Sequence, residues 1–422
     1  MKSVPTCTRV VRAGGLALAL ATLPATLATA AERLPLSTAI ELGLRHHPSL
    51  DVSRAQRDEA HAARLSAQAR PNPEIEILAG RSHARTQDTT TGNLQSLGLA
   101  QPLEWPGARE ARIKAADAGI EGALAADERA RQELIATLKQ AYFDTLRRQV
   151  ALRLATEDQQ HLEQVRLRVQ KMVDVGEAPR YEQVKAEAEM LAATRRLEGA
   201  RFDYSSGLAR LRTLIGPDAP VDPELELPET RLPETLPLPP LFEALRERHP
   251  ALREAQSAMA AALARVEEAR IERIPAPTLK ASAEQAPDTR EWRLGVSIPI
   301  PLFDTRRGPL AEAQARLTLS ESQARQVALE LTQALEQAHH RYLTSLAQFR
   351  VIEGGLRKEA EAALRVAEIA YRAGERGILD VLDAQRTLRA VREDQLHARY
   401  DIYAALIDLE RLTGENLLGV TP

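Results

Sequence analysis

Hydrophobic and polar positions alternate in four short segments of the chain, which occur as two pairs. In residues 278–284, for example, Leu279, Ala281 and Ala283 alternate with polar or charged residues. A period of two is typical of a strand with one apolar face. The pattern predicts four strands, near residues 73–81, 94–103, 277–284 and 291–300. A soluble hairpin with one buried face has the same period, so the alternation alone does not place these strands in a membrane.

Long stretches after each pair of strands have the hydrophobic spacing of α-helices. In the first half of the chain, one helix is predicted from about Ala108 to Val173, and it would span on the order of 100 Å at 1.5 Å per residue. The corresponding helix in the second half has a seam with alternating intervals of four and three, at Leu331, Leu335, Ala338, Tyr342, Ser345, Phe349, Ile352 and Leu356. This spacing is typical of a heptad coiled coil, although ordinary helix packing is similar. The sequence thus predicts a mainly α protein with a small β part.

The two halves of the chain repeat one another, and this duplication constrains the fold most strongly. LSTAIELGLRHHPSL (36–50) matches LPPLFEALRERHPAL (238–252), which places His47-Pro48 on His249-Pro250. Three further matches pair residues 96–109 with 293–306, 133–141 with 330–338, and Val175-Gly176 with Ala373-Gly374. Each half is predicted to form a helix, a β-hairpin, a very long helix, a tight turn and a final helix.

Proline content marks the boundary between the halves. Residues 217–240 hold 8 of the 25 prolines, which excludes a continuous helix and indicates a connector over the surface. The predicted division is a signal peptide (1–30), a first structural repeat (31–216), a Pro-rich equatorial connector (217–240), a second structural repeat (241–416) and a C-terminal tail (417–422).

The first thirty residues have the three parts of a secretory signal peptide. Three basic residues precede an apolar stretch from Ala13 to Leu27, and small residues follow up to Ala30. An uncleaved membrane helix is the alternative, but the stretch is shorter than the roughly 20 residues that a span needs and contains Pro24. We therefore predict export, with cleavage near Ala30 or Ala31.

Cysteine use and charge exclude several functions. Cys7 is the only cysteine and precedes the apolar stretch, so it cannot carry the lipid of a mature lipoprotein. A mature chain without Cys7 has neither disulfides nor thiolate metal ligands. The net charge of −3 becomes −6 when the three basic residues of the signal peptide are removed, which argues against a nucleic-acid partner.

No transmembrane helix is predicted after the signal peptide, because no run of 18 apolar residues occurs there. If the protein crosses a membrane, it must therefore use strands, since only helices and closed barrels satisfy every backbone polar group in lipid. The smallest membrane barrels have about 8 strands, so four strands per chain would require an oligomer. Two chains would supply about 8 strands and three about 12, and this arithmetic does not choose between them.

The segment YRAGERGILDVLDAQRTL (371–388) resembles the TolC family of outer-membrane channels, and the resemblance covers residues of about 35 to 416. It implies a homotrimer whose helices form an α-barrel tunnel through the periplasm and whose strands form a 12-stranded outer-membrane β-barrel. QPLEWPGAREAR (101–112) and SIPIPLFDTRRG (297–308) resemble the branch that serves cobalt-zinc-cadmium efflux with resistance-nodulation-division pumps.

The function implied by this resemblance is a passive outer-membrane channel of a tripartite efflux system, with heavy-metal cations as cargo. Its partners would be a periplasmic membrane-fusion adaptor, an inner-membrane resistance-nodulation-division pump and outer-membrane lipid. A multidrug or type I secretion channel is one alternative. A periplasmic coiled-coil adaptor or scaffold without membrane insertion is another, because it also accounts for the signal peptide and the long helices.

The same segment contains the candidate gate residues. Asp380 and Asp383 lie three residues apart on one helix face, and in a threefold assembly they would form two rings of carboxylates that attract cations. The alternative is that they only favour the helix dipole at an N-terminus. The resemblance implies a periplasmic gate and selectivity site at these aspartates, with a gate latch formed by Tyr371, Arg376 and Glu182. The family has an aspartate at the position of Glu182, so the longer side chain leaves the geometry of an Arg376–Glu182 pair open.

Two glycines between strong helix formers, Gly374 and Gly377, suit a chain reversal at the end of a helical hairpin. Val175 and Gly176 occupy the corresponding turn of the first half. The resemblance implies that these four residues form the hairpin-tip contact with the adaptor.

The nine histidines do not form a convincing metal site. His339 and His340 are adjacent, so their side chains diverge on a helix, while His46-His47 and His249 precede prolines and suit structural capping. No Ser-His-Asp arrangement, HExxH, P-loop or GxGxxG occurs in a supporting context. We expect neither a cofactor nor enzymatic activity.

Overall fold

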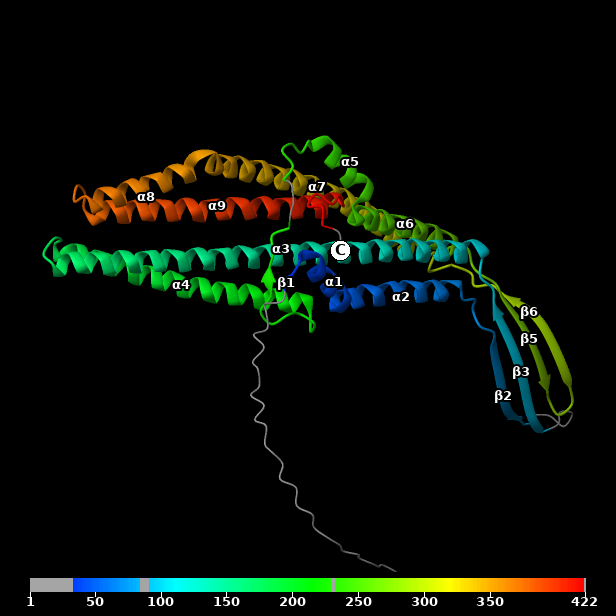
Figure 1. Cartoon of the computed structure of the whole chain (residues 1–422). Coiled ribbons are helices and arrows are strands. Elements are labelled where there is room, and N and C mark those ends of the chain that lie inside the picture. Colours follow the sequence, from blue (N-terminus) through cyan, green and yellow to red (C-terminus); the bar gives the residue numbers. More distant parts are fainter. Residues whose placement is uncertain (1–32, 84–90, 229–231, 421–422) are drawn as a thin grey trace, which may run out of the picture.

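The computed structural model describes residues 33–83, 91–228 and 232–420. The predicted signal peptide lies outside these residues. The described chain is mainly helical, with long helices side by side in an elongated body and a four-stranded sheet projecting from one end (Figure 1). None of the helices in this part of the chain combines the length and hydrophobicity needed to cross a membrane.

Both halves have the predicted order of elements. The first half contains β1 (Arg33–Leu34), α1 (Leu36–His46), α2 (Pro48–Gln68), β2 (Glu74–Ser82), β3 (Gly92–Pro102), α3 (Pro106–Asp174) and α4 (Arg180–Ile215). The second half contains β4 (Glu224–Leu225), α5 (Leu238–Arg248), α6 (Pro250–Ile271), β5 (Thr278–Gln285), β6 (Arg290–Ser297), α7 (Arg307–Val351), a π-helical turn η1 (Ile352–Leu356), α8 (Arg357–Arg372) and α9 (Ile378–Thr413). The 69 residues of α3 form one uninterrupted helix.

A His-Pro step divides the first helix of each half into two. Pro48 and Pro250 are the first residues of α2 and α6, where a missing N–H removes no intrahelical hydrogen bond. The Nδ1 atoms of His47 and His249 accept the backbone N–H two residues further on, at 3.3 and 3.2 Å. The repeated histidines are therefore N-caps of the second helix in each pair.

The four strands of the projecting sheet follow the order β2-β3-β5-β6, and all neighbours are antiparallel. One row across the sheet joins Ile77, Leu97, Ala283 and Trp292, because each residue is paired with the next. Residues paired in this way point to the same face. In the part of the chain that the structure describes, the edge strands β2 and β6 each have one neighbouring strand.

The connector between the halves is anchored to the body at several points. β4 pairs in parallel with β1. The Tyr142 hydroxyl, buried in α3, donates to the backbone oxygen of Leu34 at 2.8 Å and accepts the N–H of Glu226 at 3.1 Å. In the second half, His339 Nε2 lies 2.7 Å from the backbone oxygen of Leu236. Helices α3 and α7 thus hold the connector through the polar side chains of Tyr142 and His339.

The second long helix is not continuous, contrary to the seam predicted through Leu356. Leu335, Ala338 and Tyr342 are buried as the seam requires, but the α-helix ends at Val351 and Leu356 is exposed. The π-helical turn contains the Gly354-Gly355 pair, and Gly355 has non-helical dihedral angles (φ 168°, ψ −35°). Glycine has a low helix propensity, which explains why the interruption falls here.

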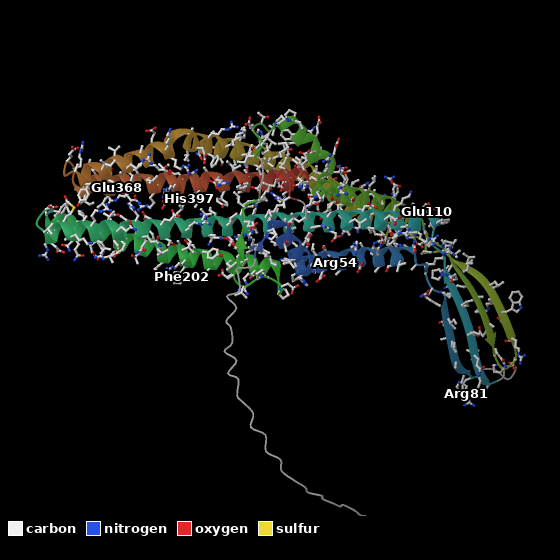
Figure 2. The ribbon with its side chains drawn as sticks, viewed as in Figure 1. Arg54, Arg81, Glu110, Phe202, Glu368 and His397 are labelled. Atoms are coloured by element: carbon white, nitrogen blue, oxygen red, sulfur yellow. The ribbon has the colours of Figure 1, made fainter. Side chains whose placement is uncertain are left out.

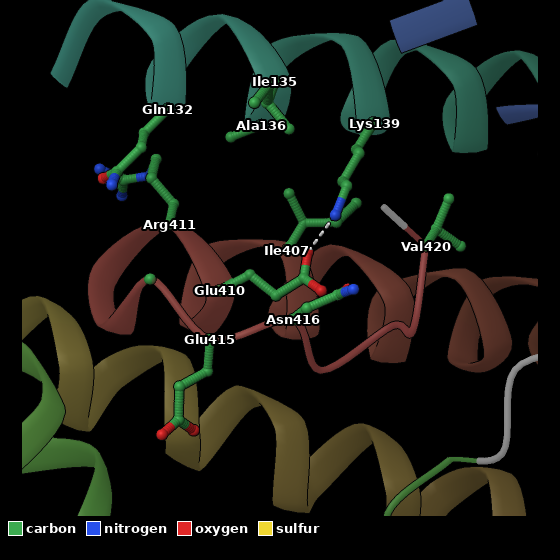
Figure 3. Close-up of a pocket in the computed structure, with 11 residues that line it drawn as sticks. Gln132, Ile135, Ala136, Lys139, Ile407, Glu410, Arg411, Glu415, Asn416 and Val420 are labelled. Atoms are coloured by element: carbon green, nitrogen blue, oxygen red, sulfur yellow. Dashed lines mark hydrogen bonds and ion pairs between the residues drawn. The ribbon is translucent and has the colours of Figure 1, made fainter. Parts of the chain in front are cut away.

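A buried ion pair joins the halves within the main core. Lys139 Nζ of α3 lies 2.6 Å from the Glu410 carboxylate of α9, and the two side chains are only 7% and 8% exposed. The other carboxylate oxygen of Glu410 accepts the backbone N–H of Leu418 at 2.7 Å. Figure 3 shows this pair beside a cavity of about 200 Å³ between α3 and α9. Because the contacts of the pair are internal, we interpret this site as structural.

Candidate functional site

The candidate functional residues lie at opposite ends of the elongated body. Figure 2 shows Glu368 of α8 toward the end formed by the helical turns and Arg81 of β2 at the far end of the sheet. The helical end, called the tip below, consists of the turns 175–179 and 373–377 with the adjoining helix ends.

Both turns of the tip are Schellman motifs. Gly176 and Gly374 have left-handed φ angles of 81° and 74°, which glycine adopts without strain. In the first turn, the N–H of Gly176 bonds to the oxygen of Val173, and that of Glu177 to the oxygen of Met172. The second turn has the equivalent pair of bonds. These are the two hydrogen bonds that define the motif. Of the other predicted tip residues, Val175 is 70% exposed, and Gly377 is the N-cap of α9.

Asp380 and Asp383 lie in the first two turns of α9, and both are exposed. The opposite face of this segment buries Ile378, Val381 and Leu382, so packing fixes the helix orientation that turns the aspartates away from the protomer's own core. An Arg376 guanidinium nitrogen is 3.4 Å from the Asp380 carboxylate.

The structure brings together two of the three predicted latch residues. The Tyr371 hydroxyl donates to the Glu182 carboxylate at 3.2 Å. Burial and the neighbouring Glu182 raise the pKa of Tyr371 to about 12, so the phenol keeps the proton that it donates. Arg376 contacts Asp380 rather than Glu182. Of the three predicted latch residues, Tyr371 and Glu182 therefore make the contact between α8 and α4 without Arg376.

Further polar contacts between the two helical pairs were not predicted from the sequence. His161 of α3 lies 3.5 Å from Glu368 of α8, and Arg386 of α9 is hydrogen-bonded to Glu189 of α4. Glu189 raises the pKa of Arg386 through this hydrogen bond. The partners are far apart in sequence and carry charges that also occur on ordinary solvated helix faces, so no local pattern distinguishes them.

The two faces of the sheet have different chemistry. The row containing Ile77 and Trp292 belongs to an apolar face whose large side chains are exposed, with Ile77 at 75%, Trp292 at 77% and Leu294 at 74%. On the opposite face, Arg293 pairs with Glu284 and Glu291 at 3.5 and 2.6 Å. An exposed apolar face of this extent marks a surface that contacts protein or lipid.

The segment 101–112 ties the sheet to the helices. The Arg112 guanidinium bonds to the backbone oxygens of Ala67 and Ala69 and to the Glu104 carboxylate. The Trp105 indole N–H donates to the backbone oxygen of Ile274 at 3.2 Å. These contacts give the segment a structural role at the point where the chain passes between sheet and helices. In the corresponding part of the second half, Ile300, Leu302 and Phe303 are largely exposed.

The described residues contain no cluster of three or more His, Cys, Asp or Glu side chains able to hold a metal ion. His339 and His249 are engaged in the backbone contacts given above. Burial, with Arg411 and Arg129 nearby, lowers the pKa of His249 to about 4, so this ring is neutral at physiological pH.

Comparison with known proteins gives one family. The family model described as "Outer membrane efflux protein" matches residues 39–217 and 241–415. The cobalt-zinc-cadmium resistance protein CzcC of Cupriavidus metallidurans is 27% identical, with 91% of each chain covered. Protein CyaE of Bordetella pertussis is 29% identical over 88% of this chain and 81% of its own.

Solved structures show the same fold. The outer-membrane channel OprN superposes with a TM-score of 0.79 at 22% identity, covering 91% of this chain and 90% of that one. The two intervals of the family match leave out residues 218–240, which lie in the connector between the halves.

Proposed function

The chain belongs to the outer membrane efflux protein family, and we propose that it is the outer-membrane channel of a tripartite system that exports heavy-metal cations. The observation that carries this proposal is the joining of an exposed apolar sheet to a helical body about 100 Å long. The sheet face suits lipid, and the helices reach away from it toward an inner-membrane pump and a periplasmic adaptor. The protein is a conduit and not an enzyme.

The active form would be a homotrimer. Among the described residues, the outer edges of strands β2 and β6 have no neighbouring strand, so in lipid their backbone groups would bond to strands of other copies. The proposal of three copies is supported by the family resemblance rather than by the strand count. The signal peptide within residues 1–30 would direct export, and Cys7 before the apolar stretch argues against a lipoprotein.

The tip would be both the gate and the adaptor contact. In a trimer, the exposed Asp380 and Asp383 would form rings of carboxylates at the periplasmic entrance, with the Tyr371–Glu182 contact holding the helical pairs together. The turns containing Val175, Gly176, Gly374 and Gly377 would meet the adaptor.

The cargo is inferred from the relatives. CzcC is named for resistance to cobalt, zinc and cadmium, and segments 101–112 and 297–308 resemble the same branch. A wide tunnel selects little by itself, so the choice of cargo would rest mainly with the pump.

Deletion of the gene tests the cargo. We expect the deletion strain to become more sensitive to zinc, cobalt and cadmium, with tolerance restored by the gene on a plasmid. Unchanged metal tolerance together with new drug sensitivity would assign the channel to multidrug efflux. Release of the protein in periplasmic extract without detergent would instead favour the scaffold alternative.

A further inference from the structure

Helix α9 has irregular surroundings on two sides at the level of residues 388–396. On one side lies η1, because Gln395 Nε2 donates to the Glu353 carboxylate at 2.6 Å. On the other side, a cavity of about 250 Å³ separates α9 from α3 and α4. Its lining includes Leu154, Gly199 and Leu396. Regular packing is therefore interrupted on both sides of α9 at one height.

A polar cluster with two buried members joins α3, α4 and α9 at the edge of this cavity. Asp158 of α3 accepts a hydrogen bond from Gln385 of α9 at 2.9 Å and another from Arg196 of α4 at 2.9 Å. Asp158 and Gln385 are each only 8% exposed. Gln385 Oε1 has no hydrogen-bond partner among the described residues. A buried acceptor without a partner carries a free-energy cost, which separation of the helices would relieve.

The α8–α9 hairpin has an apolar cluster of its own. Apolar side chains on η1, α8 and α9 form their own small cluster, which includes Ile352, Ala360, Leu388 and Val391. Beyond this level toward the tip, the hairpin meets α3 and α4 through the Tyr371–Glu182 hydrogen bond and a second apolar cluster that contains two alanines of α4. The polar contacts His161–Glu368 and Arg386–Glu189 lie in the same region. The firmest packing of the two halves is in the main core, on the opposite side of η1.

We propose that the α8–α9 hairpin pivots at η1 and that the Asp158–Gln385–Arg196 cluster holds it against α3 and α4. The proposal rests on the channel function given above and adds to it a pivot and a restraint located within the helical body, away from the tip. Loss of the restraint favours a displaced hairpin and a wider entrance. A regular helix at η1 opposes this displacement.

Two changes with opposite expected effects test the proposal in the full-length trimer. Asp158→Ala removes the acceptor of both hydrogen bonds and should raise single-channel conductance in planar bilayers at least twofold. Asp158→Asn keeps the shape and one acceptor oxygen, so its conductance should return most of the way to that of the parent. Gly354→Ala combined with Gly355→Ala favours regular helix, and a Cβ at either position meets open space, so conductance should fall below that of the parent.

Gln140→Ala is the matched control, because Gln140 of α3 also bonds to α9, at Asp408, but does so at the level of the main core. Its conductance should equal that of the parent. Hydrogen–deuterium exchange provides a second measurement that needs no channel. Residues 378–390 should exchange faster in Asp158→Ala and more slowly in the double glycine variant.

The outcomes separate this proposal from the proposed function. If the parent protein formed no channels, the proposed channel function would be refuted. Hydrogen–deuterium exchange would still test the proposed pivot at η1 and the restraint at Asp158. Channels with parental conductance and parental exchange in Asp158→Ala would refute the restraint. If the double glycine variant had the parent's conductance and the parent's rate of hydrogen exchange, the pivot at η1 would be refuted.

Discussion

At the scale of single residues, the two tip aspartates have different surroundings although they share a helix face. Arg376 lies 3.4 Å from Asp380 and partly neutralises it, whereas Asp383 lies one turn further along α9. Both remain exposed, so their removal leaves the core unchanged.

We expect Asp383→Ala to weaken block of the channel by a trivalent cation more than Asp380→Ala does, and the double variant to weaken it most. Converging carboxylates attract multivalent cations strongly. Arg376 pairs with Asp380, whereas Arg386, the arginine near Asp383, is hydrogen-bonded to Glu189. Single-channel recording measures the block. Asp51→Ala in α2, another exposed carboxylate paired with an arginine, is the control. If the double variant were blocked as strongly as the parent, the aspartates would have no role in the gate. They would then only interact favourably with the dipole at the N-terminus of α9.

His249 predicts a stability change with pH. Its pKa in the folded protein is about 4, below the ordinary value of 6.5, so the unfolded chain binds a proton first as the pH falls. The free energy of unfolding is therefore highest above pH 6.5. It decreases as the pH falls toward 4, by an amount on the order of 3 kcal/mol. His249→Asn retains a capping oxygen and should flatten this dependence, which thermal melting from pH 7 to pH 4 can measure. Equal slopes for parent and variant would contradict the assignment.

The sequence anticipated some of these residues and missed others for identifiable reasons. The repetition of His-Pro in the two halves indicated capping, which the structure shows at His47 and His249. Asp158 and Gln385 carry no such signal, because one is an ordinary acid and the other an ordinary amide in long polar helices. Only the packing of α3 against α9 makes them a buried pair.

At the scale of elements, the duplicated sequence encodes duplicated turns. Each tip turn has the same two backbone hydrogen bonds and a glycine with positive φ. The strands lie within a few residues of their predicted positions because alternation and flanking prolines define them locally. The two-residue strands β1 and β4 and the π-helical turn were missed, since each depends on tertiary contacts or on a break inside an otherwise helical pattern.

Gly374→Ala should destabilise the tip by about 1 kcal/mol, because alanine is strained at positive φ. The effect should appear as faster hydrogen exchange of residues 370–380 with little change in global melting temperature. Gly199→Ala is the matched control, since this glycine lies inside α4 and a Cβ there meets open space. It should stabilise the protein slightly. Equal exchange at the tip in parent and Gly374→Ala would show that the turn tolerates a side chain.

At the scale of the whole molecule, the repeat predicts how one copy meets the next. The correspondence of the hairpins maps the β2–β3 pair Ile77–Leu97 onto the β5–β6 pair Ala281–Leu294. It also maps Leu99 onto Val296. Because Leu99 lies opposite Ala281 within the chain, Val296 should lie opposite Ile77 of a second copy.

We expect the mature protein in detergent to have the mass of a trimer, and Ile77→Cys combined with Val296→Cys to cross-link its copies under oxidation. Leu78→Cys with Val296→Cys is the control, because residues one position apart in a strand face opposite sides of the sheet. A monomeric mass, or equal cross-linking of both pairs, would contradict this closure.

The uninterrupted length of α3 would also set how far the proposed channel reaches into the periplasm. The segment α7–η1–α8 runs the same course in the second half, from the sheet to the tip. Adding one residue to either segment would lengthen it by about 1.5 Å and rotate everything beyond it by about 100°. An insertion in α3 would thus turn Glu182 away from its present direction, and one in α7–η1–α8 would do the same to Asp380. Changes in the length of these helices are therefore expected only in steps that preserve the helical phase, and in both halves together. In the proposed channel, the distance that the helices reach from the outer membrane is thereby fixed by the residue count of a single chain.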